Sequence, residues 1–208
     1  MTVHLVTGGS SGIGACLVER LRSRGDEVIA PTRSELDLED SSAIRSWVQS
    51  LGLARVDSLV HCAGVVDLAP VSGFDRTSWE TTLAVNLLAP AELTSAMLPT
   101  LRASAATVVF VNSGAGLSAH PQWSSYAASK FGLRALADAL RAEEPDLRVT
   151  SIFPGRVATR MQAEVHRQEG RTYDESAWIR PETVVDQIIG VLDLGPDAQV
   201  PEVVVRPR

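Results

Sequence analysis

Lysine, cysteine and long apolar runs are scarce in this chain. One of its nineteen basic residues is a lysine, two residues are cysteines, and the net charge is −6. Because no block of lysine or arginine interrupts this acidic balance, we expect no nucleic-acid partner and no anionic membrane surface. No apolar run is long enough to span a bilayer. Cys16 and Cys62 match no metal-ligand spacing, which predicts reduced thiols and no metal site.

The length and the order of patterns indicate one domain covering residues 1–208. A chain of this size buries roughly 70% of its unfolded surface. Its N-terminus runs directly into a strand pattern without the features of a signal peptide, so we expect a cytoplasmic protein. Strand-like apolar runs alternate with helical spacing from end to end. This order predicts an α/β fold, namely a doubly wound Rossmann-type domain with a mainly parallel sheet of six or seven strands.

A glycine-rich turn follows the first expected strand, Val3–Val6. The turn reads Thr7-Gly-Gly-Ser-Ser-Gly-Ile-Gly14 and leads into helical apolar spacing. Such a turn lets the backbone approach a pyrophosphate and directs a helix N-terminus at its charge. An ordinary turn can have the same glycines, but the flanking strand and helix favour a nucleotide site. Its expected contacts are Gly8, Ser10, Ser11, Gly12, Ile13 and Gly14.

The single lysine ends a second pattern, Tyr126-Ala-Ala-Ser-Lys130. Side chains four residues apart share one face of a helix. A fixed ammonium favours the phenolate, lowers the tyrosine pKa, and so makes a usable general acid or base. The spacing can arise by chance, but arginine fills the other eighteen basic positions, which favours a chemical role for the compact amine. Ser113 follows the apolar run Thr107–Asn112, so we expect it at the ligand-binding edge of a parallel sheet.

The glycine pattern together with Ser113, Tyr126 and Lys130 resembles the short-chain dehydrogenase/reductases over nearly the whole chain. The resemblance implies an NAD(P)-dependent oxidoreductase whose catalytic residues are Asn86, Ser113, Tyr126 and Lys130. Tyr126 and Lys130 would also contact the cofactor, and Asn86 would hold a water for proton resupply. The segment Pro154-Gly155, with Val157 and Thr159, would hold the nicotinamide carboxamide. The family further implies a substrate lid over residues 160–180 and a homodimer or homotetramer.

The second expected strand, Glu27–Pro31, ends at Thr32-Arg33. In dinucleotide sites a carboxylate here binds the ribose, whereas an arginine accommodates a 2′-phosphate. Arg33 therefore favours NADP(H), with NAD(H) as the alternative cofactor, although the same residue can be a solvated surface arginine. Only two residues separate Arg33 from Asp37 and Leu38, which resemble the family's adenine contacts. A parallel crossover needs about a dozen residues, which puts the family's usual third strand in doubt.

The strand expected to begin at Asp57 ends in His61-Cys62-Ala63-Gly64, where the family usually has Asn-Asn-Ala-Gly. Ala63 and Gly64 still let the cofactor approach the backbone. We interpret His61 as structural, because Tyr126 already supplies the proton. Apolar spacing from residue 79 to residue 101 predicts a helix that Pro90 kinks and Pro99 ends. The remaining expected elements are helices Ser41–Leu51 and Pro181–Leu192 and strands Arg148–Phe153 and Glu202–Val205.

Together these patterns predict an NADPH-dependent reduction of a ketone or aldehyde. Tyr126 would protonate the carbonyl oxygen and Ser113 would donate a hydrogen bond to it. Two alternatives stay open: an NADP(H)-binding sensor or scaffold without turnover, and an NAD-dependent alcohol dehydrogenase. We expect little charge in the substrate pocket and therefore a modestly apolar carbonyl compound. The pocket residues expected from the sequence are His120, Gln122, Trp123 and Trp178.

Overall fold

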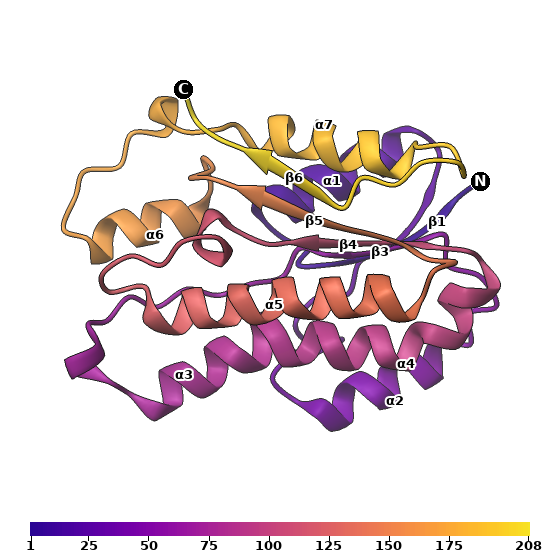
Figure 1. The fold of residues 1–208 in the computed structure, drawn as a ribbon, viewed down its shortest axis with the longest axis horizontal. Coiled ribbons are helices and arrows are strands. Elements are labelled where there is room, and N and C mark those ends of the chain that lie inside the picture. Colours follow the sequence, from indigo (N-terminus) through magenta and orange to yellow (C-terminus); the bar gives the residue numbers. More distant parts are fainter.

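A computed structural model describes residues 1–208 and contains one sheet of six strands (Figure 1). The strands follow the order β2-β1-β3-β4-β5-β6, and each neighbouring pair is parallel. Their bounds are β1 Val3–Thr7, β2 Glu27–Ile29, β3 Ser58–His61, β4 Thr107–Val111, β5 Arg148–Pro154 and β6 Glu202–Val205. The predicted α/β class and parallel sheet are confirmed. No helix combines the length and apolar character needed to cross a membrane.

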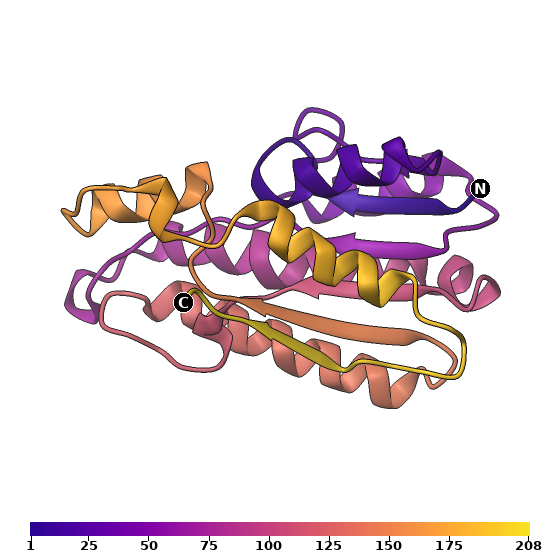
Figure 2. The same cartoon turned by 90° about the horizontal axis from the view of Figure 1, so that it is seen from above.

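Helices cover both faces of the sheet, as the two views in Figures 1 and 2 show. The α-helices are α1 Gly12–Ser23, α2 Ser41–Leu51, α3 Arg76–Leu83, α4 Ala89–Ala103, α5 Ser124–Glu143, α6 Arg160–Gln168 and α7 Pro181–Leu192. Neighbouring strand residues point to opposite faces, so Leu5 packs into a core with helices α2, α4 and α5, whereas Val6 packs into a second core with α1 and α7. Helix α6 projects beyond the carboxyl ends of the strands (Figure 2).

The family's usual third strand is absent from this sheet. Between β2 and α2 the chain forms turns, and Thr32 N donates to Glu35 Oε2 at 2.7 Å. Asp40 then caps α2 by accepting hydrogen bonds from the backbone amides of Ser42 and Ala43. The doubt about this strand was therefore justified, and β2 is left as an edge strand. The loss also brings residues 36–39 directly to the carboxyl edge of the sheet.

The helical segment before β4 departs from the sequence-based prediction. A π-helical turn, Ala84–Leu88, joins α3 to α4 and ends two residues before Pro90, where a kink was expected. The prediction that Pro99 ends the helix is wrong, because α4 continues to Ala103. Pro99 and Ser95 both lie on the exposed side of α4. Water can therefore bind the Ser95 carbonyl that Pro99 leaves without a donor, while Met97 and Leu101 bury the opposite side.

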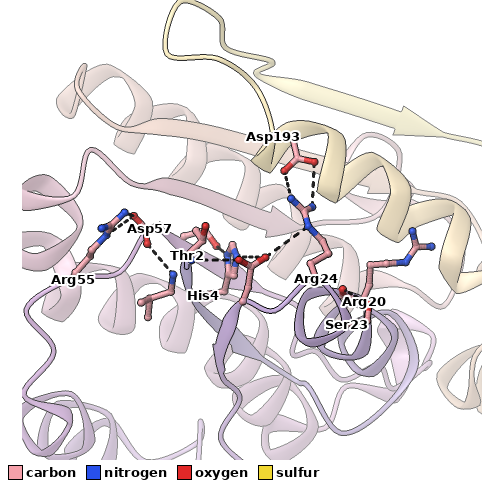
Figure 3. Close-up of polar contacts among 11 residues, drawn as sticks. Thr2, His4, Arg20, Ser23, Arg24, Arg55, Asp57 and Asp193 are labelled. Atoms are coloured by element: carbon pink, nitrogen blue, oxygen red, sulfur yellow. Dashed lines mark hydrogen bonds and ion pairs between the residues drawn. The ribbon is translucent and has the colours of Figure 1, made fainter.

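Paired charges close the amino-terminal edge of the sheet (Figure 3). Asp57 accepts a hydrogen bond from Val3 N at 2.8 Å and forms an ion pair with Arg55. Arg24, just after α1, binds Asp193 at the end of α7 through two hydrogen bonds of 2.7 and 3.1 Å. These contacts fix the start of β1 to β3 and join the ends of α1 and α7.

Candidate active site

A cavity of about 800 Å³ opens along the carboxyl edge of the sheet. Segments that follow all six strands line it, and its volume lies in the usual range for small-molecule sites. The cavity brings together most residues singled out from the sequence. They are Gly8, Ser10, Ser11, Gly12, Ile13, Arg33, Asp37, Leu38, Ala63, Gly64, Ser113, Tyr126, Lys130, Pro154, Gly155, Val157 and Thr159. Of the predicted catalytic and cofactor residues, only Gly14 and Asn86 do not line the cavity.

The glycine turn has a conformation that larger residues would not allow. Gly8 and Gly12 have φ values of +70° and +52°. A Cβ on Gly8 would stand 2.6 Å from Ala63 N, and one on Gly14 would stand 2.2 Å from the Gly8 carbonyl oxygen. Gly14 therefore packs α1 against the turn instead of facing the cavity, which corrects its expected role as a cofactor contact.

The N-terminus of α1 fits the phosphate groups of a dinucleotide. Ser11 occupies the N-cap position, but its side chain makes no capping hydrogen bond. The first backbone amides of the helix thus keep donors for an anion, and the helix dipole favours negative charge there. Together with the close backbone approach at Gly8, this cradle suits a nicotinamide dinucleotide.

Helix α5 carries the central pair of the site. Tyr126 and Lys130 are both buried, and Lys130 Nζ lies 5.7 Å from the centre of the Tyr126 ring. The ammonium donates a hydrogen bond to the Val111 carbonyl at 3.0 Å. Ser113 follows β4 by two residues, and its Oγ accepts a hydrogen bond from Ala115 N at 3.1 Å. This bond leaves the Ser113 hydroxyl proton free to be donated.

The pKa values of this pair differ from the sequence-based expectation. Burial raises the pKa of Tyr126, and a hydrogen bond with Ser113 opposes this rise only in part. Burial and the Ser113 hydrogen bond account for the shift of the Tyr126 pKa, and the Lys130 ammonium donates to the Val111 carbonyl instead of to the phenol. Burial also lowers the pKa of Lys130 to about 8. At neutral pH the phenol therefore keeps its proton, whereas most of the lysine is charged.

Asn86 is fully buried in the π-helical turn before α4. Its Oδ1 accepts from Val65 N at 2.8 Å, and its Nδ2 donates to the Val65 carbonyl and to Ser129 Oγ at 2.9 and 3.1 Å. The side chain thus fixes the loop after β3 and has no donor left for a water. Pro90 lacks an N–H, so the Asn86 main-chain carbonyl has no usual helical donor. This carbonyl is therefore an acceptor at Asn86 that could hold a water.

His61 and Cys62 replace the family's usual asparagines at the end of β3. His61 Nε2 hydrogen-bonds with Thr94 Oγ1 at 2.9 Å, and its ring stacks on Phe110 at 5.0 Å. Burial lowers the pKa of His61 to about 3, so the ring is neutral, in keeping with a structural role. Cys62 lines the cavity, and burial raises its pKa to about 12, so the thiol stays protonated.

Arg33 lines the cavity at the end near β2, as the sequence predicted, but it already has a partner. Its Nη2 lies 2.6 Å from Glu39 Oε1, and Glu39 also accepts a hydrogen bond from Thr81 Oγ1 at 3.1 Å. Glu39 is not among the site residues predicted from the sequence. The signal was present in the shortened segment after Arg33, which leaves no room for an intervening helix and so keeps residues 36–39 close to β2.

The opposite end of the cavity is more charged than the sequence suggested. His120 and Trp123 line it, whereas Gln122 lines only a smaller adjoining hollow. Trp178 lies outside the cavity and stacks on Arg156 at 5.4 Å. Gln122 and Trp178 therefore do not line the main cavity, contrary to expectation. The expectation of little charge in the substrate pocket is also wrong. The charged lining residues here are Arg156, Glu169, Arg171 and Arg206.

Arg156 forms the best-defined ion pair of this end. Its guanidinium binds Glu169 through two hydrogen bonds of 2.9 and 2.6 Å, which hold the pKa of that carboxyl below its usual range. The guanidinium also lies over Trp123, 5.8 Å from the ring centre. Glu169 follows α6, so the pair ties the segment expected to be a lid to the loop after β5.

Known proteins that are similar to this chain belong to the family that its sequence motifs resemble. The sequence profile of the short chain dehydrogenase family matches residues 2–170. An uncharacterized oxidoreductase of Schizosaccharomyces pombe is 31% identical over 189 residues, covering 81% of this chain and 76% of the relative.

Two solved structures are similar along the whole chain. An alcohol dehydrogenase from the archaeon Thermococcus sibiricus, complexed with 5-hydroxy-NADP, has a TM-score of 0.86 and 20% identity, covering 100% of this chain and 97% of its own. A 4-hydroxyisoleucine dehydrogenase complexed with NADH has a TM-score of 0.88 and 23% identity, covering 100% of this chain and 98% of its own. At these identities the structural likeness supports the fold, while the profile match and the yeast relative support the family. The chain belongs to the short-chain dehydrogenase family.

Proposed function

We propose that this protein reduces a ketone or an aldehyde to an alcohol with NADPH, and that Tyr126 is the general acid. The observation that carries the proposal is a buried tyrosine beside Ser113 in the same cavity as the dinucleotide cradle. Because burial raises the pKa of Tyr126, the phenol holds its proton at neutral pH, which is the form that reduction requires. Alcohol oxidation would instead need the phenolate.

The proposed cofactor site runs from the glycine turn to the loop after β5. When bound, NADPH would supply the hydride. The amides at the start of α1 would hold the pyrophosphate, Asp37 and Leu38 the adenine, and Val157 and Thr159 the carboxamide. Arg33 would bind a 2′-phosphate after leaving Glu39. The two solved relatives hold an NADP derivative and NADH, so the preference for NADP(H) over NAD(H) depends on Arg33.

Each catalytic side chain has a separate task in the proposed reaction. Tyr126 gives its proton to the carbonyl oxygen, and Ser113 donates a hydrogen bond to the same oxygen as negative charge develops on it. Lys130 binds the cofactor's ribose and supplies positive charge near the phenol. A water on the Asn86 carbonyl resupplies the proton. Residues 160–180 would close over the substrate and exclude bulk water.

The direct test is the loss of NADPH absorbance with aliphatic, aromatic and cyclic carbonyl compounds, with NADH measured in parallel. Tyr126→Phe should lower turnover by about 10²–10⁴-fold, the usual contribution of a positioned acid. Its affinity for NADPH, measured by calorimetry, should stay unchanged. Turnover retained by Tyr126→Phe would refute the role of Tyr126. A faster reaction with NADH than with NADPH would favour the NAD-dependent alternative.

A second candidate is a sensor or scaffold that binds NADP(H) without turnover. The ion pair between Arg33 and Glu39 bears on the cofactor in both cases, because it occupies the arginine proposed for the 2′-phosphate. Tight binding of NADPH with no turnover across the carbonyl panel would support it.

We also propose that the protein forms a homodimer or homotetramer through α4 and α5. Leu88, just before α4, and Phe131 in α5 are large apolar residues that are 53% and 43% exposed. Exposed apolar groups on neighbouring helices are typical of protein interfaces. Light scattering of the purified protein tests this directly, and a monomer at micromolar concentration would contradict it.

A further inference from the structure

The cavity is basic although the chain is acidic. Six basic and three acidic side chains line it, whereas the whole chain has a net charge of −6. Part of this positive charge lies where cofactor phosphates are proposed. Arg33 stands at the adenosine end, and Arg160 follows Thr159, whose methyl group would be 3.2 Å from a Cβ on Gly12. At the other end, Arg156 and Arg171 lie within 4 Å of the Glu169 carboxylate, whereas Arg206 has no acid beside it.

Arg206 lines the cavity beside Gly114, the residue that follows the proposed catalytic serine. It directly follows β6, which pairs with β5 up to Val205 opposite Pro154, so it emerges at the carboxyl edge of the sheet. Its Nη1 lies 2.5 Å from the position that a Cβ on Gly114 would take. Gly114 directly follows Ser113. A side chain at position 114 would therefore displace the Arg206 guanidinium from this place.

The chain itself gives Arg206 no partner. Arg33 and Arg156, which line the same cavity, form ion pairs of 2.6 Å with Glu39 and Glu169. No ion pair or hydrogen bond connects the Arg206 guanidinium to any other residue. Glu169 is the one acid at this end of the cavity, and both of its carboxylate oxygens already accept hydrogen bonds from Arg156. A guanidinium beside a reaction centre with all five donors free is ready to bind an external anion.

We propose that Arg206 binds the carboxylate of the substrate, which makes the substrate a small oxo acid. The inference rests on the proposed carbonyl reduction and names its substrate class. A guanidinium matches a carboxylate with two parallel hydrogen bonds. Because Arg206 and Ser113 flank the same glycine, the carboxylate and the carbonyl are separated by only a few bonds. Reduction adds a hydride from NADPH to the ketone carbon and a proton from Tyr126 to its oxygen. The products are a hydroxy acid and NADP⁺, and the carboxylate is unchanged.

The experiment compares oxo acids with their uncharged esters. kcat/KM is measured with NADPH for pyruvate, acetoacetate and levulinate, which differ in the spacing of carboxylate and carbonyl, and for their methyl esters. The variants are Arg206→Gln, Arg206→Lys and the control Arg208→Gln, which removes an exposed arginine that does not line the cavity. Circular dichroism confirms folding, and calorimetry measures NADPH affinity for each variant.

We expect the wild type to favour at least one acid over its ester. Arg206→Gln should lower kcat/KM for that acid by about 10–100-fold, the usual effect of losing a charge-assisted hydrogen-bond pair. The ester reaction and NADPH affinity should stay unchanged. Arg206→Lys should lose less activity than Arg206→Gln, because lysine keeps the positive charge but lacks the two parallel N–H donors of the guanidinium. Arg208→Gln should behave as the wild type.

Three results would overturn the inference: equal use of acids and esters by the wild type, an equal loss for both in Arg206→Gln, or weaker NADPH binding by that variant, which would assign Arg206 to the cofactor. If the wild type reduces neither acids nor neutral carbonyls, the proposed function fails separately. Calorimetric titration of acetoacetate into the protein with NADP⁺ then decides the inference. Binding that Arg206→Gln removes supports it, and no binding by the wild type refutes it.

Discussion

At the amino-terminal edge of the sheet the acids near β1 have partners within the chain, whereas at the carboxyl-terminal edge several donors have none. Asp57 and Asp193 bind Val3, Arg55 and Arg24 (Figure 3). At the opposite edge, Arg206 has no partner and the amides at the start of α1 have no side-chain cap. The acids of the amino-terminal edge are thus paired within the protein, whereas polar groups at the carboxyl-terminal edge are left available to ligands.

Lys130, at the carboxyl-terminal edge, shows how an unpaired buried charge lowers the stability of the fold. Its ammonium is buried against the Val111 carbonyl with no carboxylate beside it, and burial lowers its pKa to about 8. A buried charge without a counterion destabilises the fold. By contrast, Asp57 and Asp193 at the amino-terminal edge are partly exposed and lie beside arginines. The three substitutions below test this comparison, beginning with the largest expected effect.

Replacing Lys130 by Met should remove a pH-dependent part of the stability. The folded-state pKa of about 8 is below the usual 10.5, so between these values the unfolded chain binds more protons than the folded one. The free energy of unfolding of the wild type should therefore rise through this window relative to Lys130→Met, by about 3 kcal/mol in total. Urea unfolding of both proteins across this pH range measures the difference.

The stability difference between wild type and Lys130→Met should be flat below the window, where the amine is protonated in both states. A difference that stays constant across the window would show that Lys130 is hydrated and not desolvated. Turnover should fall in the variant at every pH, because the proposed ribose contact is lost. Tyr126→Phe serves as the matched control, since it lowers turnover while leaving the lysine charge in place.

Asp57→Asn should weaken the amino-terminal edge by about 1–2 kcal/mol without changing turnover. Burial alone would raise the pKa of Asp57, but hydrogen bonds from Arg55 and Val3 N outweigh it and hold the pKa below its usual range. The stabilisation is therefore present above the unfolded pKa and is lost as pH falls through the folded value. Urea unfolding near neutral pH and in mild acid measures it. A fall in kcat/KM would show that the two edges are coupled.

Asp193→Asn should have the smallest effect, below about 1 kcal/mol. The pair with Arg24 joins the ends of α1 and α7, but both side chains are well exposed, at 38% and 50%. Water and salt screen exposed pairs, so their contribution to stability is small. Thermal unfolding at low and high salt measures it, with the larger difference from wild type expected at low salt. A larger loss than for Asp57→Asn would reverse this ranking.

Local patterns in the sequence were enough to predict the class of fold, the parallel sheet and the position of most cavity residues. Strand and helix periodicities, the glycine turn and the spacing of Tyr126 and Lys130 depend on neighbours within a few residues, so they can be read along the chain. The shortened segment after Arg33 also correctly indicated a missing strand. Pro99 misled the prediction because a helix tolerates proline where the freed carbonyl faces water.

The contacts among charged and buried groups could not be predicted from local sequence patterns. Arg206 and Gly114 are 92 positions apart in the numbering, and they meet because β4 and β6 lie on either side of β5. The pairing of Arg156 with Glu169, the bonding of the Asn86 side chain and the raised pKa of Tyr126 likewise depend on burial and on contacts between distant segments. The motifs along the chain identify which side chains can do the chemistry. Their protonation and partners depend on desolvation, which exists only once the sheet is assembled.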